Sequence, residues 1–546
     1  MPSPLVTKTI LLVACLLGIS IPATAQVSIV NRNLEQLEQE RERKILKHEL
    51  DTMRETRSPS QEQPATRTKL PTGNFQFVLK KVSYSPSKVL MDEEIARVTA
   101  PWINKIIGAP ELGQLIEAIN QLYREKGYAV CQAALRPQRI RNGNLTITLI
   151  EGKTDTVTVN NLNHTKDSYV LRAFDMPVGK VANYRDMYER LVRFNMTNDI
   201  HLSIDIQAGE RPETTRYEIY AQEPNNWTAS IFADTLGTDS SGRYRAGASI
   251  SNRSVFGYRD SLYLIGIATE GSKSVLGGYS VPLNSFGTRL IANLSAGDVD
   301  IIEGPNEPFD VSEQSFTASL RLEHPFAITE TSKQIAFTEY SYKSSETDMY
   351  SDMTIAKSQI DTVSVGLDSL MLGNQWSMYL NNRFSYHKAR EKLFGNQYNY
   401  WIYSGDWFGQ ALLNQQFSLN ASASWQAKFT GDEVVSDDQF YLGNSAGVRG
   451  YPNDVLSADN GFWINIEAQY RWIDSFNTFV FFDAGHLSGV SSYDKRGLYS
   501  TGIGLNWNPC EWAQVKATMG VPLTRQVTVF EKVDSVRFDA TLTITY

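Results

Sequence analysis

The fold is decided by the stretch Phe417-Ser-Leu-Asn-Ala-Ser-Ala-Ser-Trp-Gln-Ala-Lys-Phe429. Apolar side chains take every odd-numbered position and polar side chains every even-numbered one, which is the period of a β-strand. Residues 464–472 and 536–546 alternate in the same way. Strands of soluble sandwiches usually have about five or six residues, whereas these runs are longer. Long strands with one apolar and one polar face predict a membrane-spanning β-barrel.

Working outward, the alternating pattern begins at Trp227 and continues to the C-terminus. At about 20 residues for each strand with its share of loop, residues 227–546 predict a barrel of about 16 antiparallel strands. We therefore assign residues 226–546 to the barrel. Tryptophan is common where membrane meets water, and four tryptophans lie at predicted strand ends, namely Trp227, Trp472, Trp507 and Trp512.

The composition agrees with a barrel and excludes several other classes. The 546 residues carry 52 Lys and Arg against 60 Asp and Glu, so a nucleic-acid partner is not expected. A mean hydropathy of -0.31 excludes a bundle of membrane helices, because each span needs about 20 apolar residues. With three Cys and six scattered His, a disulfide scaffold or metal site is not expected. We expect two unpaired thiols, Cys131 and Cys510, and no cofactor.

One motif resembles an enzyme signature. Gly443-Asn-Ser-Ala-Gly447 fits the G-x-S-x-G nucleophile elbow, and Asp483 and His486 follow it. The elbow requires a buried strand before the serine and a helix after it. A polar loop precedes this serine and Arg-Gly-Tyr-Pro follows it, so we expect no hydrolase and no catalytic residue.

The N-terminus predicts export from the cytoplasm. Lys8, an apolar run over residues 10–21 and Ala23-Thr24-Ala25 are typical of a signal peptide spanning residues 1–25. A lipoprotein signal ending at Cys15 is the alternative, but it would shorten the apolar core to about five residues. Residues 26–57 predict a helix that is polar on nearly every face, either a solvated spacer or coiled-coil arm, or an occupant of a polar cavity. Residues 58–73, with three prolines, predict a linker.

Between the linker and the barrel, one order of elements occurs twice, in residues 74–152 and 153–225. Each segment predicts β-α-α-β-β and contains no nucleophile, metal-ligand set or phosphate loop, so we interpret both as binding modules. An exposed edge strand beside a helix would accept an extended peptide by strand addition. The first module predicts strands at 75–82, 129–135 and 145–150 and helices at 92–107, interrupted at Pro101, and 111–126. The second predicts strands at 156–160, 200–206 and 214–220 and helices at 167–173 and 184–194.

This organisation resembles the outer-membrane transporters of two-partner secretion, which export haemolysins and filamentous adhesins. The resemblance covers nearly all of the mature chain. Tyr123-Arg-Glu-Lys-Gly-Tyr128, Leu135-Arg-Pro-Gln138, Gly143 and Glu151-Gly152 are similar to the first POTRA domain of that family. The similarity of the second module rests on its element order and on Gly209-Glu210.

The most specific match is Val448-Arg449-Gly450-Tyr451, in a predicted loop over residues 431–461. The resemblance implies that this loop folds back into the lumen, and that Arg449 faces the Asp483 of Phe482-Asp-Ala-Gly485 on the barrel wall. A buried arginine needs such an acceptor, and an arginine-carboxylate pair can be bidentate. The simpler alternative is an ordinary turn and an ordinary strand end. We also assign a C-terminal assembly signal to Tyr546.

The resemblance implies a function as well as a fold. The periplasmic modules would capture an unfolded secreted partner, a large haemolysin or adhesin, and the pore would pass it through the outer membrane without ATP. The polar helix would occupy the pore, and the outer-membrane assembly machinery would be a further partner. Two alternatives remain, an insertase of the wider outer-membrane assembly superfamily and a passive porin.

Overall fold

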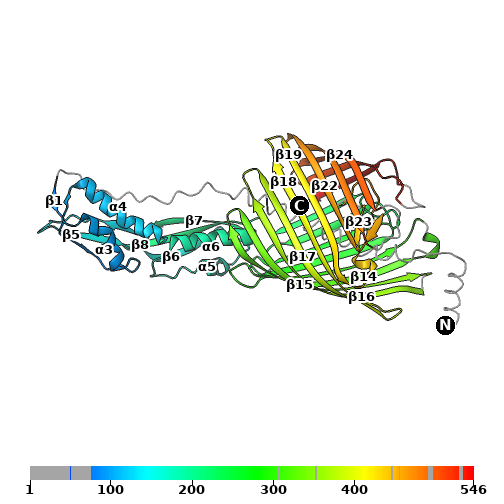
Figure 1. The fold of residues 1–546 in the computed structure, drawn as a ribbon, viewed down its shortest axis with the longest axis horizontal. Helices are drawn as coiled ribbons and strands as arrows, with labels where there is room; N and C mark the ends of the chain where they lie inside the picture. Colours follow the sequence, from blue (N-terminus) through cyan, green and yellow to red (C-terminus); the bar gives the residue numbers. More distant parts are fainter. Residues whose placement is uncertain are drawn as a thin grey trace.

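The computed structural model describes residues 50, 75–128, 130–304, 306–350, 353–443, 447–453, 455–489, 496–527 and 533–546. The predicted signal peptide, the linker and all of the predicted polar helix except Leu50 lie outside the described residues. The two modules follow one another along the length of the molecule and the barrel forms its other end (Figure 1).

The first module packs two helices against a three-stranded sheet of order β2-β5-β4, and a separate pair, β1 with β3, lies beside it. Ile95, Leu115, Ile119 and Ile147 form part of its buried core. The bounds are β1 Phe77–Val78, β2 Lys81–Tyr84, α3 Asp92–Thr99, η1 Ala100–Trp102, β3 Ile106–Ile107, α4 Ala109–Glu125, β4 Gln132–Ala134 and β5 Asn144–Ile150.

Two predictions for this module were wrong in detail. The helix expected over residues 92–107, interrupted at Pro101, ends at Thr99 and does not resume as an α-helix, because Pro101 has no N–H to continue the hydrogen bonding and the chain goes on as the 3-10 turn η1. The chain then turns through Asn104, whose φ is 63°, and Ile106–Ile107 pairs with β1. The strand expected over residues 75–82 is divided between β1 and β2, which pair with different partners.

The second module repeats the arrangement, with sheet order β6-β8-β7. In both modules the first strand runs parallel to the central strand and the third lies antiparallel on the other edge. The backbone N–H of Tyr184 donates to the carbonyl of Gly127 at 2.8 Å, which joins the modules at the end of α4. The bounds are β6 Lys153–Asn160, α5 Asp167–Phe174, α6 Tyr184–Thr197, β7 His201–Ala208 and β8 Thr214–Gln222.

The remaining chain forms a closed antiparallel barrel of 16 strands, which confirms the predicted number. Each strand pairs with its neighbour in sequence, except that β19 pairs with β22 across a long loop and β26 pairs with β9 to close the barrel. The bounds are β9 Trp227–Asp234, β10 Arg245–Asn252, β11 Ser261–Ala268, β12 Ser272–Pro282, β13 Arg289–Asp300, β14 Ser312–Thr329, β15 Ser332–Met349, β16 Met353–Leu372, β17 Trp376–Glu391, β18 Asn396–Leu412, β19 Phe417–Gly431, β22 Asn460–Ile473, β23 Phe476–Ser488, β24 Gly497–Cys510, β25 Ala513–Pro522 and β26 Arg537–Thr545.

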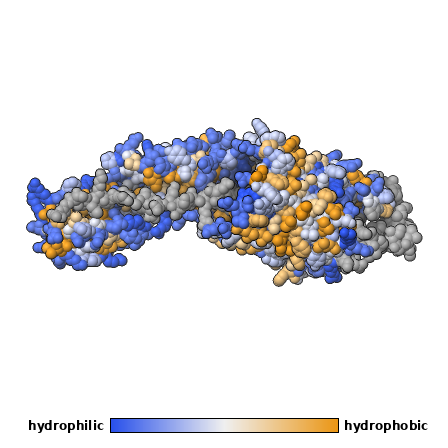
Figure 2. Space-filling view, turned by 90° about the horizontal axis from the view of Figure 1, so that it is seen from above, coloured by the Kyte–Doolittle hydropathy of each residue, from blue (hydrophilic) through white to orange (hydrophobic). Residues whose placement is uncertain are grey.

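The barrel carries its apolar side chains on the outside, as the alternation predicted. On β16, Val363, Val365 and Leu367 are exposed, whereas Ser364 and Asp368 between and beyond them are buried on the lumen side. Figure 2 shows hydrophobic side chains gathered on the outer surface of the barrel, while the modules are mostly hydrophilic. Among the described helices, none is both long and apolar enough to cross a membrane.

The four tryptophans lie at one end of the barrel. Trp227 begins β9 directly after the second module, and Trp472, Trp507 and Trp512 lie near the strand ends on that same side. All four side chains are exposed. An exposed aromatic belt at strand ends is where a membrane surface would meet the barrel.

Candidate functional site: a loop fastened inside the barrel

The connection between β19 and β22 enters the barrel instead of leaving it. It forms a small hairpin of β20 (Phe440–Leu442) and β21 (Leu456–Ala458). Apolar residues of the loop pack in one buried cluster with lumen-facing wall residues Trp463, Leu487 and Leu498. Because this part of the lumen wall is apolar, it holds the loop as a protein core holds a hairpin.

Arg449 is fastened to Asp483 by three hydrogen bonds. Its Nη2 donates to Oδ1 of Asp483 at 2.7 Å, its Nε to Oδ2 at 2.8 Å, and its backbone N–H to Oδ2 at 3.0 Å. Asp483 is fully buried and Arg449 nearly so. The bidentate geometry fixes the orientation of the guanidinium as well as its position.

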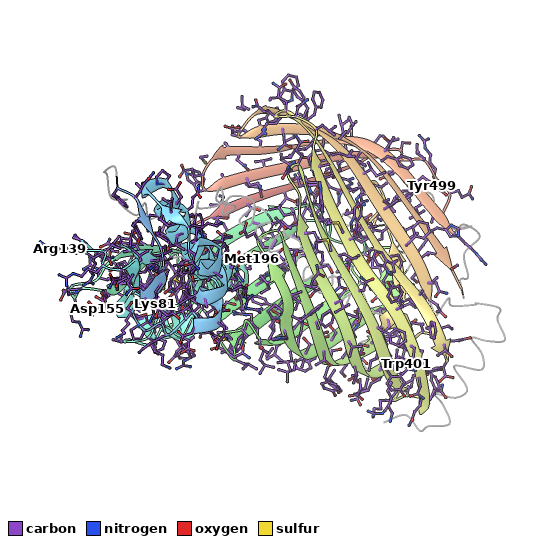
Figure 3. All side chains as sticks on the ribbon, turned by 60° about the vertical axis from the view of Figure 1, so that its left-hand side comes forward. Lys81, Arg139, Asp155, Met196, Trp401 and Tyr499 are labelled. Carbon is purple, nitrogen blue, oxygen red and sulfur yellow. The ribbon has the colours of Figure 1, made fainter. Side chains whose placement is uncertain are left out.

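The other residues of the tetrapeptide also contact the wall. Val448 is fully buried in the loop cluster. The hydroxyl of Tyr451 donates to the carbonyl of Tyr499 on β24 at 2.7 Å and accepts from the N–H of Thr524 at 3.0 Å. The ring of Tyr499 itself points away from the barrel wall (Figure 3). The tetrapeptide therefore reaches β23, β24 and the connection that follows β25.

Three glycines permit this close packing. Gly450 has a φ of 87°, and a Cβ on Gly520 of β25 would lie 2.7 Å from its Cα. A Cβ on Gly485 would lie 2.6 Å from Cδ2 of Leu442 and 3.0 Å from Cγ2 of Val448. A side chain at Gly485 or Gly520 would therefore push the loop off the wall.

Two residues that were singled out from the sequence lie away from this contact. Phe482 points to the outer face of β23, where it is exposed, because it alternates with Phe481 and Asp483. Tyr546 follows β26 with an exposed side chain, and its backbone exchanges hydrogen bonds with Ala229 of β9 at 2.7 and 3.0 Å.

Sequence reasoning missed three residues of the site. Glu467 on β22 is an ion-pair partner of Nη1 of Arg449, and the guanidinium carbon lies 3.8 Å from the centroid of the Phe481 ring. Gly520 is the third. The alternation placed Glu467 on the polar face of its strand, which was a usable signal. The position of Gly520 depends on the path of the loop, for which the sequence carried no signal.

The arrangement does not support the hydrolase alternative. The Asp483 carboxylate is occupied by Arg449, and His486, three residues further along β23, is exposed on the opposite face of the strand. Across the described ranges, no group of three His, Cys, Asp or Glu could hold a metal ion. Cys131 and Cys510 are both free, as expected, and burial raises the pKa of the Cys131 thiol to about 12, so it is unreactive at neutral pH.

The lumen between this loop and the modules is lined with charge. Arg321 on β14 pairs with Asp368 on β16, and Arg383 on β17 pairs with Glu339 on β15 at 3.0 Å. These side chains are largely buried from bulk water by the surrounding wall. A charged, paired lining is suited to a polar occupant of the pore.

At the mouth facing the modules, three parts of the chain meet. Leu50, in helical conformation, is buried against Met196 of α6 and against Leu370 and Leu372 of β16. Figure 3 shows Met196 where the second module reaches the barrel.

The second module is held there by an ion pair. Nε of Arg259, in the β10–β11 turn, donates to Oδ1 of Asp199 at 2.8 Å, and Arg253 lies 3.3 Å from the same carboxylate. The Arg259 side chain is almost fully buried in this contact. The mouth is therefore a joint between the second module, the barrel and Leu50 of the predicted polar helix.

Comparisons with known proteins place these features in context. A family model described as haemolysin secretion/activation protein ShlB/FhaC/HecB matches residues 213–507, and a ShlB-type POTRA domain matches residues 77–152. The heme/hemopexin transporter protein HuxB of Haemophilus influenzae is 23% identical over 499 residues, which cover 84% of this chain and 86% of the relative. The outer membrane transporter CdiB of Dickeya dadantii is 19% identical over 474 residues, 82% of this chain and 83% of the relative.

The solved structures most useful for comparison share the fold. CdiB from Escherichia coli matches with a TM-score of 0.71 and 20% identity, over 96% of this chain and all (100%) of that one. BamA from Haemophilus ducreyi lacking POTRA domains 1–3 matches with a TM-score of 0.53 and 14% identity, over 86% of this chain and all (100%) of that one.

Proposed function

The chain belongs to the haemolysin secretion/activation protein family ShlB/FhaC/HecB, whose members are outer-membrane transporters that export partner proteins, and we propose how its parts divide that task. The modules, at residues 74–152 and 153–225, lie in the periplasm and capture a large, unfolded secreted partner. The barrel, residues 226–546, passes it to the cell surface. The observation that carries this proposal is the Arg449 loop fastened inside a closed barrel with modules at its mouth.

The capture step is supported by the outer edge of β7, the edge that faces away from β8. Among the residues that the structure describes, Asn195 covers this edge only at Leu202. Backbone N–H and C=O of Leu202 are both occupied by the side-chain amide of Asn195 on α6, at 2.9 Å each. Backbone groups point alternately toward and away from the neighbouring strand along an edge strand. The N–H and C=O groups of Ile204 and Ile206 therefore point away from β8, as those of Leu202 do. These groups would pair with an extended segment of the partner.

The first module has less unpaired strand edge at which a peptide could add. Its β4 has only three residues, and the amide of Gln138 occupies the backbone N–H and C=O of Thr146 at 2.9 and 2.6 Å. Strand addition is therefore assigned to β7 of the second module.

The barrel interior supports the transport step. Leu370 and Leu372 face the lumen at the periplasmic mouth, and Leu50 packs on them. The polar helix predicted at residues 26–57 would thus occupy the pore at rest and leave when the partner enters. With no ATP in the periplasm, folding of the partner outside the cell would drive export.

The family match favours this exporter over an insertase, and a passive porin would have no use for binding modules. Tyr546 stays our proposed signal for the outer-membrane assembly machinery, at the end of the last strand.

The direct test removes the modules. Deleting residues 75–224 should leave a barrel that still shows heat-modifiable mobility, because its hydrogen bonding closes on itself, yet abolish secretion of the partner. Secretion that continues through the assembled, truncated barrel would exclude capture by the modules.

A point variant tests the edge. Ile206→Pro removes an outward N–H without disturbing the β7–β8 pairing, so it should weaken binding of the partner, whereas Ile206→Ala is the matched control that keeps the N–H. Equal binding by the two variants would contradict strand addition at β7.

A further inference from the structure

A second attachment of the loop lies at its root, on barrel strands other than those that Arg449 contacts. The 3-10 turn η3, Ser436–Asp438, follows β19 and precedes β20. It carries two adjacent carboxylates, of which Asp437 is 3% exposed and the Asp438 side chain 8%. Two neighbouring buried carboxylates cost free energy unless each is well hydrogen-bonded, so their partners decide whether they have a role.

The first carboxylate is held by strands β15 and β16. Oδ2 of Asp437 accepts from the hydroxyls of Ser345 at 2.7 Å and of Ser358 at 2.5 Å. Nζ of Lys343 donates to the backbone carbonyl of the same aspartate at 3.1 Å.

The second carboxylate is held by strands β15, β17 and β18. Oδ2 of Asp438 accepts from the hydroxyl of Tyr400 and lies within hydrogen-bond distance of Nδ1 of His387, both at 2.7 Å. Nζ of Lys343 lies 3.4 Å from Oδ1. The ring of Tyr400, fully buried, stacks on that of His387.

The two attachments lie on either side of β19, the strand from which the loop starts. In the barrel order, β15 to β18 precede β19, where the loop begins, whereas Arg449 and Tyr451 bind β22, β23 and β24 beyond it. With its root bound, the stretch between η3 and the tip is much shorter than the whole loop. A shorter free segment has fewer conformations, so docking of the tip on Asp483 costs less conformational entropy.

We propose that Asp437 and Asp438 are positioning residues of the β19–β22 loop: bound to strands β15 to β18, they hold its root so that Arg449 stays docked on Asp483. This rests on the proposed function of the loop in the pore. Neither aspartate belongs to the tetrapeptide or to its wall partner, and the lumen-facing Ser345, Ser358, His387 and Tyr400 complete the anchor.

The test measures the position of the tip without any partner protein. Trypsin cleaves after arginine, and Arg449 is 6% exposed in the docked loop. Intact cells carrying the full chain are treated with trypsin, and mass spectrometry quantifies the peptide that ends at Arg449. In Asp438→Ala, cleavage should rise about tenfold or more, since loss of a hydrogen bond to a charged group shifts a local equilibrium by roughly that factor.

Controls separate anchoring from general damage. Glu433→Ala removes an exposed carboxylate of the same loop, and its cleavage should equal that of the unaltered chain. Asp483→Ala releases the tip directly and sets the upper limit. Heat-modifiable mobility shows that each barrel has assembled.

A wall variant keeps the outcome decisive if Asp438→Ala does not assemble. Ser345→Ala with Ser358→Ala leaves the loop sequence intact and should also expose Arg449. If the assembled anchor variants resist trypsin cleavage after Arg449 as well as the unaltered chain does, the proposal is overturned. Since the readout needs no secreted partner, a failure of the proposed export function would leave this result unaffected.

Discussion

The first module and the barrel arrange polar and apolar side chains in opposite ways. In the module, Leu115 and Ile119 are buried beneath helices and sheet, and the pair Arg124–Glu117 lies in solvent with side chains 35% and 64% exposed. In the barrel, Val365 faces outward, whereas Arg321 and Asp368 pair inside. We infer from this difference that loss of a buried ion pair in the barrel lowers stability substantially, whereas loss of the exposed pair in the module hardly changes it.

The largest expected effect is at the tip of the loop. Breaking a buried ion pair by removing one partner typically costs about 3–5 kcal/mol, so Arg449→Ala should cut secretion sharply while the barrel still shows heat-modifiable mobility. Asp483→Ala should behave alike.

Because the two residues act through one contact, the double variant should be no worse than either single variant. Additive losses in the secretion assay would show that the contact is not the reason for the effect.

The joint between module and barrel should give the next effect. Asp199→Ala leaves the buried Arg259 without its carboxylate partner, so the second module should move relative to the barrel and secretion should fall several-fold. Spin-label distances between module and barrel measure this motion and should broaden.

Arg253→Ala is the milder control, because its side chain is 32% exposed and Arg259 retains Asp199. Equally narrow distance distributions in the Asp199→Ala and unaltered proteins would contradict a fixed joint.

The predicted helix should have a smaller effect on secretion than on the pore. A barrel of this size leaves an aqueous channel, so deleting residues 27–57 should raise single-channel conductance in planar bilayers while sparing most secretion. Leu50→Ala removes one apolar contact with Leu370 and Leu372 and should raise conductance in part. An unchanged conductance after the deletion would favour a solvated spacer.

The smallest effect should be on the surface of the module. Exposed ion pairs are worth about 0–1 kcal/mol, so Glu117→Ala should leave secretion and the melting temperature of the module nearly unchanged. Calorimetry of the full chain measures the melting. A loss comparable to that of Arg449→Ala would remove the distinction between the two regions.

Several features of the fold could be read from local patterns. Alternation at residues 417–429 assigned each side chain to a face before any partner strand was known, because successive strand residues point to opposite sides. Strand length then indicated a membrane barrel, and the chain length gave its number of strands. The break at Pro101 was also foreseen, although the strand pairing of Ile106–Ile107 was not.

The candidate site was only partly predictable. Arg449 and Asp483 were singled out through two short motifs, and their contact distance comes from the structure. Glu467 and Phe481 lie on the faces that alternation assigned, yet nothing local showed that both would reach the same arginine.

The sequence by itself determined which residues face lipid and which face the lumen, since that depends only on the two-residue period of a strand. Tertiary structure alone decided what meets inside the lumen: the approach of Gly450 to Gly520, the carboxylates of Asp437 and Asp438 on strands β15 to β18, and Leu50 on Leu370. These contacts join residues far apart in the chain. They depend on strand register, on closure between β26 and β9 and on the path of one loop, and no local pattern encodes those three together.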